Sequence, residues 1–150
     1  MANKSNLFSD RTPTPWHLWV VGILAVLWNA IGAFDYVATQ TQIESYMAQF
    51  TPQQLEFFYG FPTWLVFFWA TAIWSSVAGS FALLLRSRFA YPLFLISLLS
   101  MIVTSIHNFG FSNGAEVMGQ VGVIFSAIIA LICVFLVIYS RAMVTRRVLT

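Results

Sequence analysis

Residues 117–140 read VMGQVGVIFSAIIALICVFLVIYS and contain no charged side chain. An α-helix rises about 1.5 Å per residue, so crossing a bilayer core takes about 20 consecutive apolar residues. This stretch is long enough to cross a membrane as one helix. Three further apolar stretches meet the same requirement, at residues 16–38, 62–85 and 90–109. The sequence therefore predicts four membrane-spanning helices.

The composition of the whole chain agrees with this prediction. Of its 150 residues, 59% are hydrophobic and 8% are charged, whereas soluble domains carry about 25% charged residues. A small soluble domain leaves much of its surface exposed and cannot hide so many apolar side chains. Composition therefore excludes a soluble domain, a disordered chain and a nucleic-acid-binding protein. The single cysteine excludes an internal disulfide and a multi-cysteine metal site.

The basic residues predict how the helices are oriented. All of them fall before the first span, between the second and third spans, or after the fourth: Lys4, Arg11, Arg86, Arg88, Arg141, Arg146 and Arg147. Because Lys and Arg are enriched on the cytoplasmic side of membrane proteins, both termini are expected in the cytoplasm. We expect residues 1–15 to form a disordered cytoplasmic tail and residues 16–150 to form a single transmembrane domain.

The lengths of the connections predict an all-α fold. Short turns after the second and third spans make neighbouring helices antiparallel, which is typical of an up-down four-helix bundle. The longest connection, residues 39–61, contains Thr51-Pro52-Gln53-Gln54, a pattern that begins helices with a capping box. A second short amphipathic turn is expected around Tyr46. These one or two short helices either lie in the lipid headgroup region or form a lid over a pocket that opens outward.

Polar residues within the spans are the candidate functional residues. Asn29 lies near the centre of its span, where it either hydrogen-bonds a neighbouring helix or contacts a ligand. Asp35 and His107 are ionisable and lie near the outer ends of their spans, where they either form a mutually stabilising pair or remain hydrated at the interface. The candidate ligand-binding residues are Asn29, Asp35, Tyr36, Thr104, His107, Asn108 and Gln120.

No recognised catalytic pattern occurs in the chain. It lacks a GxSxG nucleophile elbow, a zinc-binding HExxH helix and a glycine-rich phosphate loop. We therefore expect no catalytic residue, no metal site and no cofactor, and we expect the protein not to be an enzyme. An enzyme that acts on a lipid or a quinone remains a third hypothesis.

The stretch from Leu27 to Arg88 resembles a known group of sequences. It contains LWNAIGAFDYVATQTQ, then YMAQFTPQQLEFFYGFPTW, then LLLRSR. In these segments the chain is similar to a poorly characterised family of small bacterial four-span proteins that sometimes carry a sugar-transporter label. The resemblance implies a location in the cell inner membrane. It also implies that Asn29, Asp35, Tyr36 and the turn at residues 50–52 form one recurrent feature of the outer face.

Two functions fit these observations. In the first, the protein binds or transports a small molecule through an outward-facing pocket, polar and aromatic, beneath residues 39–61. The residues expected to stack on that ligand are Tyr36, Phe58, Tyr59 and Trp64. A single four-helix bundle leaves little lumen, so transport implies a homo-oligomer. In the alternative, the chain is a non-catalytic accessory subunit whose partners are other membrane subunits, which it contacts through outward aromatic residues such as Phe67, Phe68 and Trp69.

Overall fold

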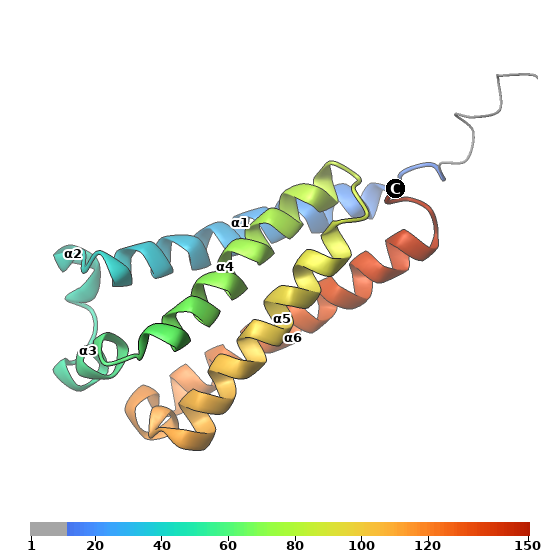
Figure 1. The fold of residues 1–150 in the computed structure, drawn as a ribbon. Helices are drawn as coiled ribbons and strands as arrows, with labels where there is room; N and C mark the ends of the chain where they lie inside the picture. Colours follow the sequence, from blue (N-terminus) through green and yellow to red (C-terminus); the bar gives the residue numbers. More distant parts are fainter. Residues whose placement is uncertain (1–11) are drawn as a thin grey trace, which may run out of the picture.

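The computed structural model describes residues 12–150, which form helices and no strands. The predicted all-α fold is therefore confirmed (Figure 1). Four long helices are joined by shorter elements, one of which, η2, is a turn of π-helix. The elements are α1 (Trp16–Gln40), α2 (Glu44–Met47), α3 (Pro52–Tyr59), α4 (Thr63–Leu84), α5 (Ala90–Ile106), η2 (His107–Phe111) and α6 (Gly114–Thr145).

Four helices are long and apolar enough to span a membrane: α1, α4, α5 together with η2, and α6. Their bounds lie close to the predicted spans, with two differences. The first helix continues to Gln40, and the last begins at Gly114 and continues to Thr145. These extra helical turns contain polar residues, so hydropathy does not count them as part of a span, although the backbone there remains helical.

The four helices form an open arc in which α4 packs between α1 and α5, and α5 packs between α4 and α6. They converge at one end, which carries the start of α1, the α4–α5 turn and the C-terminus, and is called the terminal end below. They diverge at the opposite loop end, which carries α2, α3 and η2 (Figure 1). Close packing at the terminal end involves Gly22, where an added Cβ would collide with the Leu84 side chain.

The packed core lies at the terminal end. It consists of Leu18, Ala25, Leu83, Ala90, Phe94, Leu136, Met143, Val148 and Leu149. The last residues of the chain complete it, because Val148 and Leu149 fold back and are each only 2% exposed. The backbone N–H of Thr150 donates to the carbonyl of Arg86 at 3.0 Å, which holds this C-terminal segment against the α4–α5 turn. The terminal end of the bundle is therefore closed.

Disorder is expected for residues 1–15, and residues 1–11 of this tail lie outside the described residues. Residues 12–15 are not helical, and Thr12 contacts the C-terminal segment. The Thr12 hydroxyl donates to the carbonyl of Arg146 at 2.7 Å, and the Arg86 guanidinium donates to the carbonyl of Thr12 at 3.2 Å. The chain therefore enters α1 from a defined position beside the C-terminus.

Candidate functional site: a cavity under a helical lid

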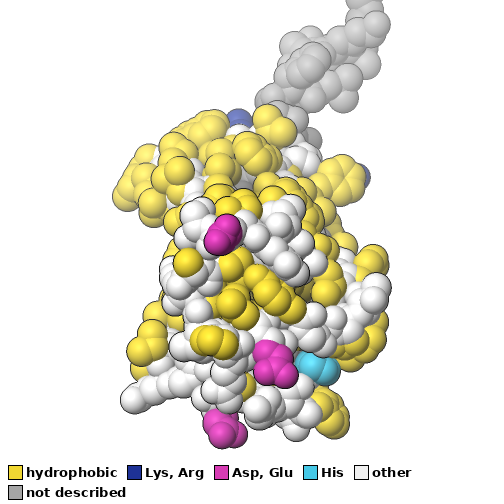
Figure 2. Space-filling model, turned by 90° about the vertical axis from the view of Figure 1, so that its left-hand side faces the viewer, with side chains coloured by type: hydrophobic (Ala, Val, Ile, Leu, Met, Phe, Trp, Pro, Cys, Tyr) yellow, Lys and Arg dark blue, Asp and Glu magenta, His cyan; other side chains and the backbone are white. Residues whose placement is uncertain are grey.

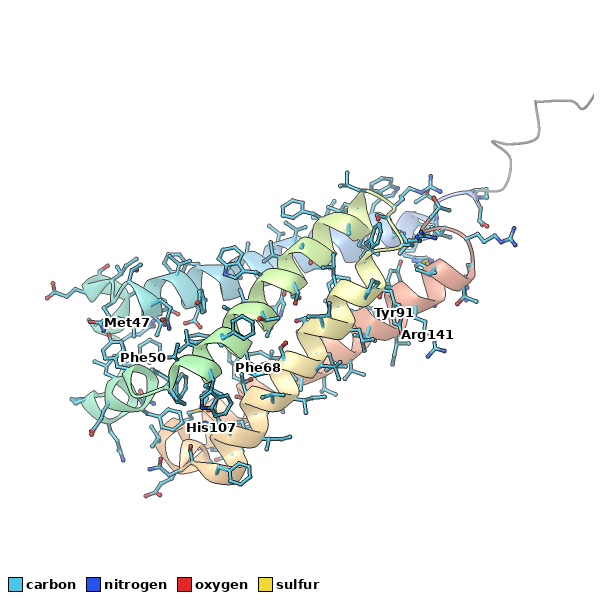
Figure 3. All side chains as sticks on the ribbon, viewed as in Figure 1. Met47, Phe50, Phe68, Tyr91, His107 and Arg141 are labelled. Carbon is cyan, nitrogen blue, oxygen red and sulfur yellow. The ribbon has the colours of Figure 1, made fainter. Side chains whose placement is uncertain are left out.

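A cavity of about 460 Å³ occupies the loop half of the bundle, where the four long helices diverge. This volume falls within the range of small-molecule binding sites. All four long helices contribute to its walls, and α2 and α3 contribute Tyr46, Gln54 and Phe58. The labelled residues Met47, Phe50 and His107 mark the loop end in Figure 3, whereas Tyr91 and Arg141 lie toward the terminal end. The cavity and the packed core therefore occupy opposite halves of the molecule.

Four of the seven predicted site residues line this cavity: Asn29, Asp35, Thr104 and Asn108. The other three do not. Tyr36 packs its ring edge-to-face against Trp69 and Trp74, with centroids 5.0 and 6.4 Å away. Gln120 is exposed on α6. His107 belongs to η2, beside the cavity wall.

Asp35 hydrogen-bonds a tyrosine of the lid. The Tyr46 hydroxyl donates to Asp35 Oδ1 at 2.6 Å, which joins α2 to the last turns of α1. Burial, followed by this hydrogen bond and the negative charge of Asp35, raises the pKa of Tyr46 to about 12. The phenol therefore stays protonated at physiological pH and remains a hydrogen-bond donor.

His107 has other partners. Its Nδ1 lies 3.3 Å from Asn108 Oδ1 and 3.4 Å from the Ser112 hydroxyl, and its ring packs edge-to-face on Trp64. Of the two alternatives for Asp35 and His107, the mutually stabilising pair is thus not formed, because Asp35 bonds Tyr46 and His107 bonds Asn108 and Ser112. Their positions near the outer ends of two predicted spans indicated a similar depth, but depth does not specify which helices are neighbours.

Asn29 joins two helices. Its Nδ2 donates to the Ser80 hydroxyl and its Oδ1 accepts from the Ser76 hydroxyl, both at 2.9 Å. Of the two interpretations of Asn29, the structure therefore shows the interhelical hydrogen bonds, between α1 and α4. A third serine extends this polar seam, because the Ser97 hydroxyl of α5 donates to the carbonyl of Ala72 on α4 at 2.7 Å. This seam forms the floor of the cavity toward the packed core.

The short helices α2 and α3 cover the cavity at the loop end. The predicted capping box is confirmed: Gln54 N–H donates to the Thr51 hydroxyl at 3.2 Å, and Thr51 N–H donates to Gln54 Oε1 at 3.1 Å. The same glutamine reaches α6, because its Nε2 donates to the carbonyl of Val117 at 3.4 Å. The lid is thus tied to α1 through Tyr46 and to α6 through Gln54.

Aromatic rings make continuous contact across the lid. Tyr46 contacts Phe50, Phe50 contacts Phe58, and Phe58 contacts Phe61, at centroid distances of 5.8, 5.4 and 6.2 Å. Of the four aromatic residues expected to stack on a ligand, only Phe58 lines the cavity. The other aromatic residues in its wall are Trp28, Tyr46, Phe50, Phe61, Trp69, Phe109 and Phe125. The sequence pattern indicates an aromatic loop, but which rings face inward depends on how the lid folds back.

Two irregular backbone segments border the cavity. Between α5 and α6, η2 is π-helical, a local geometry that is frequent at functional sites. Within α6, Gly119 has φ 68° and ψ −177°, a region that essentially only glycine adopts, and this breaks the helix near its start. Met118 and Gly122, on either side of the break, both line the cavity. The wall formed by α6 is therefore built around a break rather than a continuous helix.

Tyr46 and Gln54 are the members of the site that sequence reasoning placed elsewhere. The pattern identified Tyr46 as part of an amphipathic turn and Gln54 as part of a cap, with no contact to Asp35 or α6. Within residues 12–150, no group of three or more His, Cys, Asp or Glu side chains is placed to hold a metal ion. Comparisons of the chain with protein-family models, with curated proteins and with solved structures found no match.

Proposed function

We propose that this protein binds or transports a small amphipathic molecule in the cavity beneath α2 and α3. One observation carries this proposal: a cavity of about 460 Å³ that has mainly apolar and aromatic walls, a few polar groups and a helical lid. Aromatic walls with a small number of placed polar groups are typical of small-molecule sites. Asp35, Thr104 and Asn108 are the side chains that we assign to the polar part of the ligand. We assign Asn29 chiefly to helix packing, because its side-chain nitrogen and oxygen both form hydrogen bonds with serines of α4.

The proposed setting is the bacterial inner membrane, with both termini in the cytoplasm. Five of the seven basic residues lie among the described residues, and all five are at the terminal end: Arg86, Arg88, Arg141, Arg146 and Arg147. By the positive-inside rule, the lid then faces outward. The resemblance to small four-span inner-membrane proteins supports the same setting. A homo-oligomer fits transport best, since the cavity of one bundle is closed at the terminal end.

The test uses native mass spectrometry of the protein purified gently from its source membrane. Ser126 lines the cavity, and the next residue of α6, Ala127, is exposed outside it. Ser126→Phe therefore places a phenyl ring inside the cavity and reduces its free volume, and Ala127→Phe adds a phenyl ring to the outer surface as a matched control. We expect a retained small molecule in the wild type and in the Ala127→Phe protein, and none in the Ser126→Phe protein.

Two results would overturn the proposal. The first is a retained molecule that survives Ser126→Phe, because it would lie outside the cavity. The second is the absence of any retained molecule together with stoichiometric co-purification of other membrane polypeptides, which would favour the accessory-subunit alternative. The exposed aromatic Phe67, 65% accessible on α4, would then be the first position to substitute for loss of those partners.

A further inference from the structure

The charge of the cavity wall identifies the kind of ligand it suits. Of the described residues that line the cavity, Asp35 is the only acidic one, and none is Lys, Arg or His. Its Oδ1 accepts a hydrogen bond from the Tyr46 hydroxyl, and this phenol brings no positive charge to the carboxyl group. Asp35 is half-buried, and a charge that is partly removed from water is costly unless it has an opposite charge as a partner. A ligand with a positive charge supplies that partner.

The surface of the loop end also carries negatively charged side chains. Glu44 on α2, Glu56 on α3 and Glu116 on α6 are all exposed there. Figure 2 views the molecule from this end and shows acidic side chains on the face, with Lys and Arg only at its margin. A surface that carries one sign of charge raises the local concentration of ions of the opposite sign. Cations are thus favoured both at the surface and inside.

The wall below Asp35 suits an apolar body. Trp28, Trp69 and Phe125 line the same cavity as Asp35. Aromatic ring faces also attract cations, by about 0.5–2 kcal/mol each. The combination of one carboxylate with several aromatic rings therefore favours a cation whose charge is surrounded by apolar groups.

The cavity reaches the side of the bundle where α1 and α6 face each other. Because α4 lies between α1 and α5, and α5 lies between α4 and α6, the helices α1 and α6 are the two ends of the arc. Midway along α1 they meet through Trp28 and Phe125, whose ring centroids are 6.1 Å apart. Ile31 and Phe125 line the cavity and are 65% and 53% exposed, so they stand at its rim. In a bilayer, that rim faces the acyl chains.

We propose that the ligand is a lipophilic cation: its positive charge pairs with Asp35, and its apolar body lies between α1 and α6 against Trp28, Trp69 and Phe125. This inference rests on the proposed function and names its ligand class.

The test compares two probes of nearly equal size and opposite charge, tetraphenylphosphonium and tetraphenylborate. Equilibrium dialysis measures binding to the purified protein in detergent, and the Ser126→Phe protein corrects for partition into the micelle. We expect the wild type to bind the phosphonium more tightly than the borate. Asp35→Asn keeps an oxygen for Tyr46 and removes the charge, so it is expected to weaken phosphonium binding about tenfold or more and to strengthen borate binding. Glu116→Gln, which removes an exposed carboxylate outside the cavity, is the matched control and leaves both affinities within about twofold.

The opposite change for the two probes separates a charge effect from misfolding, because an unfolded protein loses both affinities. The proposal is overturned if Asp35→Asn leaves phosphonium binding unchanged or if the wild type binds the two probes equally. If neither probe binds, while mass spectrometry detects a molecule that Ser126→Phe removes, the proposed function stands and the cationic ligand class is rejected. If neither experiment detects cavity binding, both are rejected.

Discussion

The substitution Asn29→Ala tests how α1 is held against α4. It removes two interhelical hydrogen bonds, from Nδ2 to Ser80 and from Ser76 to Oδ1, both 2.9 Å long. Interhelical hydrogen bonds in membrane proteins are worth about 0.6 kcal/mol on average and about 1.7 kcal/mol at most. The two together are therefore worth about 1–3 kcal/mol.

The structure places the expected value in the lower part of that range. Without Asn29, the Ser80 hydroxyl still donates to the carbonyl of Ser76 at 2.9 Å. The Ser76 hydroxyl is free to turn to the carbonyl one helical turn earlier, as serines in helices commonly do. Neither serine is then left without a partner. We expect a loss of about 1–2 kcal/mol in the free energy of unfolding, a factor of about 5–30 in the equilibrium constant.

The assay is reversible unfolding in mixed micelles of increasing SDS content, followed by circular dichroism. Leu24→Ala is the control, because that side chain of α1 is 60% exposed, and it is expected to change stability by less than about 0.5 kcal/mol. A double-mutant cycle with Ser76→Ala is expected to give a coupling energy of about 0.6 kcal/mol. Additive single mutants, or an Asn29→Ala protein as stable as the wild type, would refute the assignment of Asn29 to packing.

Three further outcomes are expected. Gly119→Ala places a side chain on a residue with φ 68°, and it is expected to lower the free energy of unfolding in the same assay by about 1–3 kcal/mol. Gly110→Ala is the control, because Gly110 does not have a positive φ. Equal effects of the two substitutions would contradict backbone strain at Gly119. Tyr46 has its pKa raised to about 12, so the stabilisation it provides is complete below about pH 10, the pKa of an unperturbed phenol, and is lost as the pH rises through about 12. Titration of the absorbance at 295 nm is expected to show a late-ionising phenol that Tyr46→Phe removes, and a Tyr46→Phe curve identical in shape to the wild type would disprove it. Leu149→Ala removes most of a side chain that is 2% exposed at the terminal end, and it is expected to lower the free energy of unfolding in SDS titration by about 2–5 kcal/mol. An unchanged free energy of unfolding would contradict the packing of the C-terminal segment.

Hydropathy and capping patterns predict most of the secondary structure because both depend on residues that are close in the chain. The four spans follow from the lengths of the apolar stretches, and α3 follows from the Thr51–Gln54 capping box. The inward faces of the helices are also predictable, since small and polar residues at helical spacing mark contacts with neighbours. Asn29, Ser76 and Ser97 all lie on such faces, and all three form hydrogen bonds between helices.

The turns at the ends of three helices are harder to predict from the sequence. Three helices end with a residue in the left-handed conformation, at Gln42, Arg86 and Arg147, and none of the three is glycine. In each case the next residue donates its backbone N–H to a carbonyl five residues before it, as in Ile43 to Ala38 at 3.0 Å. Glycine usually identifies this type of helix end. Because Gln42 takes this position instead of glycine, the sequence does not predict the chain reversal that brings Tyr46 back to Asp35.

By itself, the sequence determines that this chain forms four helices able to span a membrane, with polar and aromatic residues gathered at one end. Those properties follow from composition and from spacing along the chain. Only the tertiary structure decides that the helices form an open arc, packed at the terminal end and hollow at the loop end, and that Asp35 faces Tyr46 rather than His107. The physical reason is that hydropathy specifies which residues lie at similar depth, whereas the order in which the helices pack side by side specifies which of them meet.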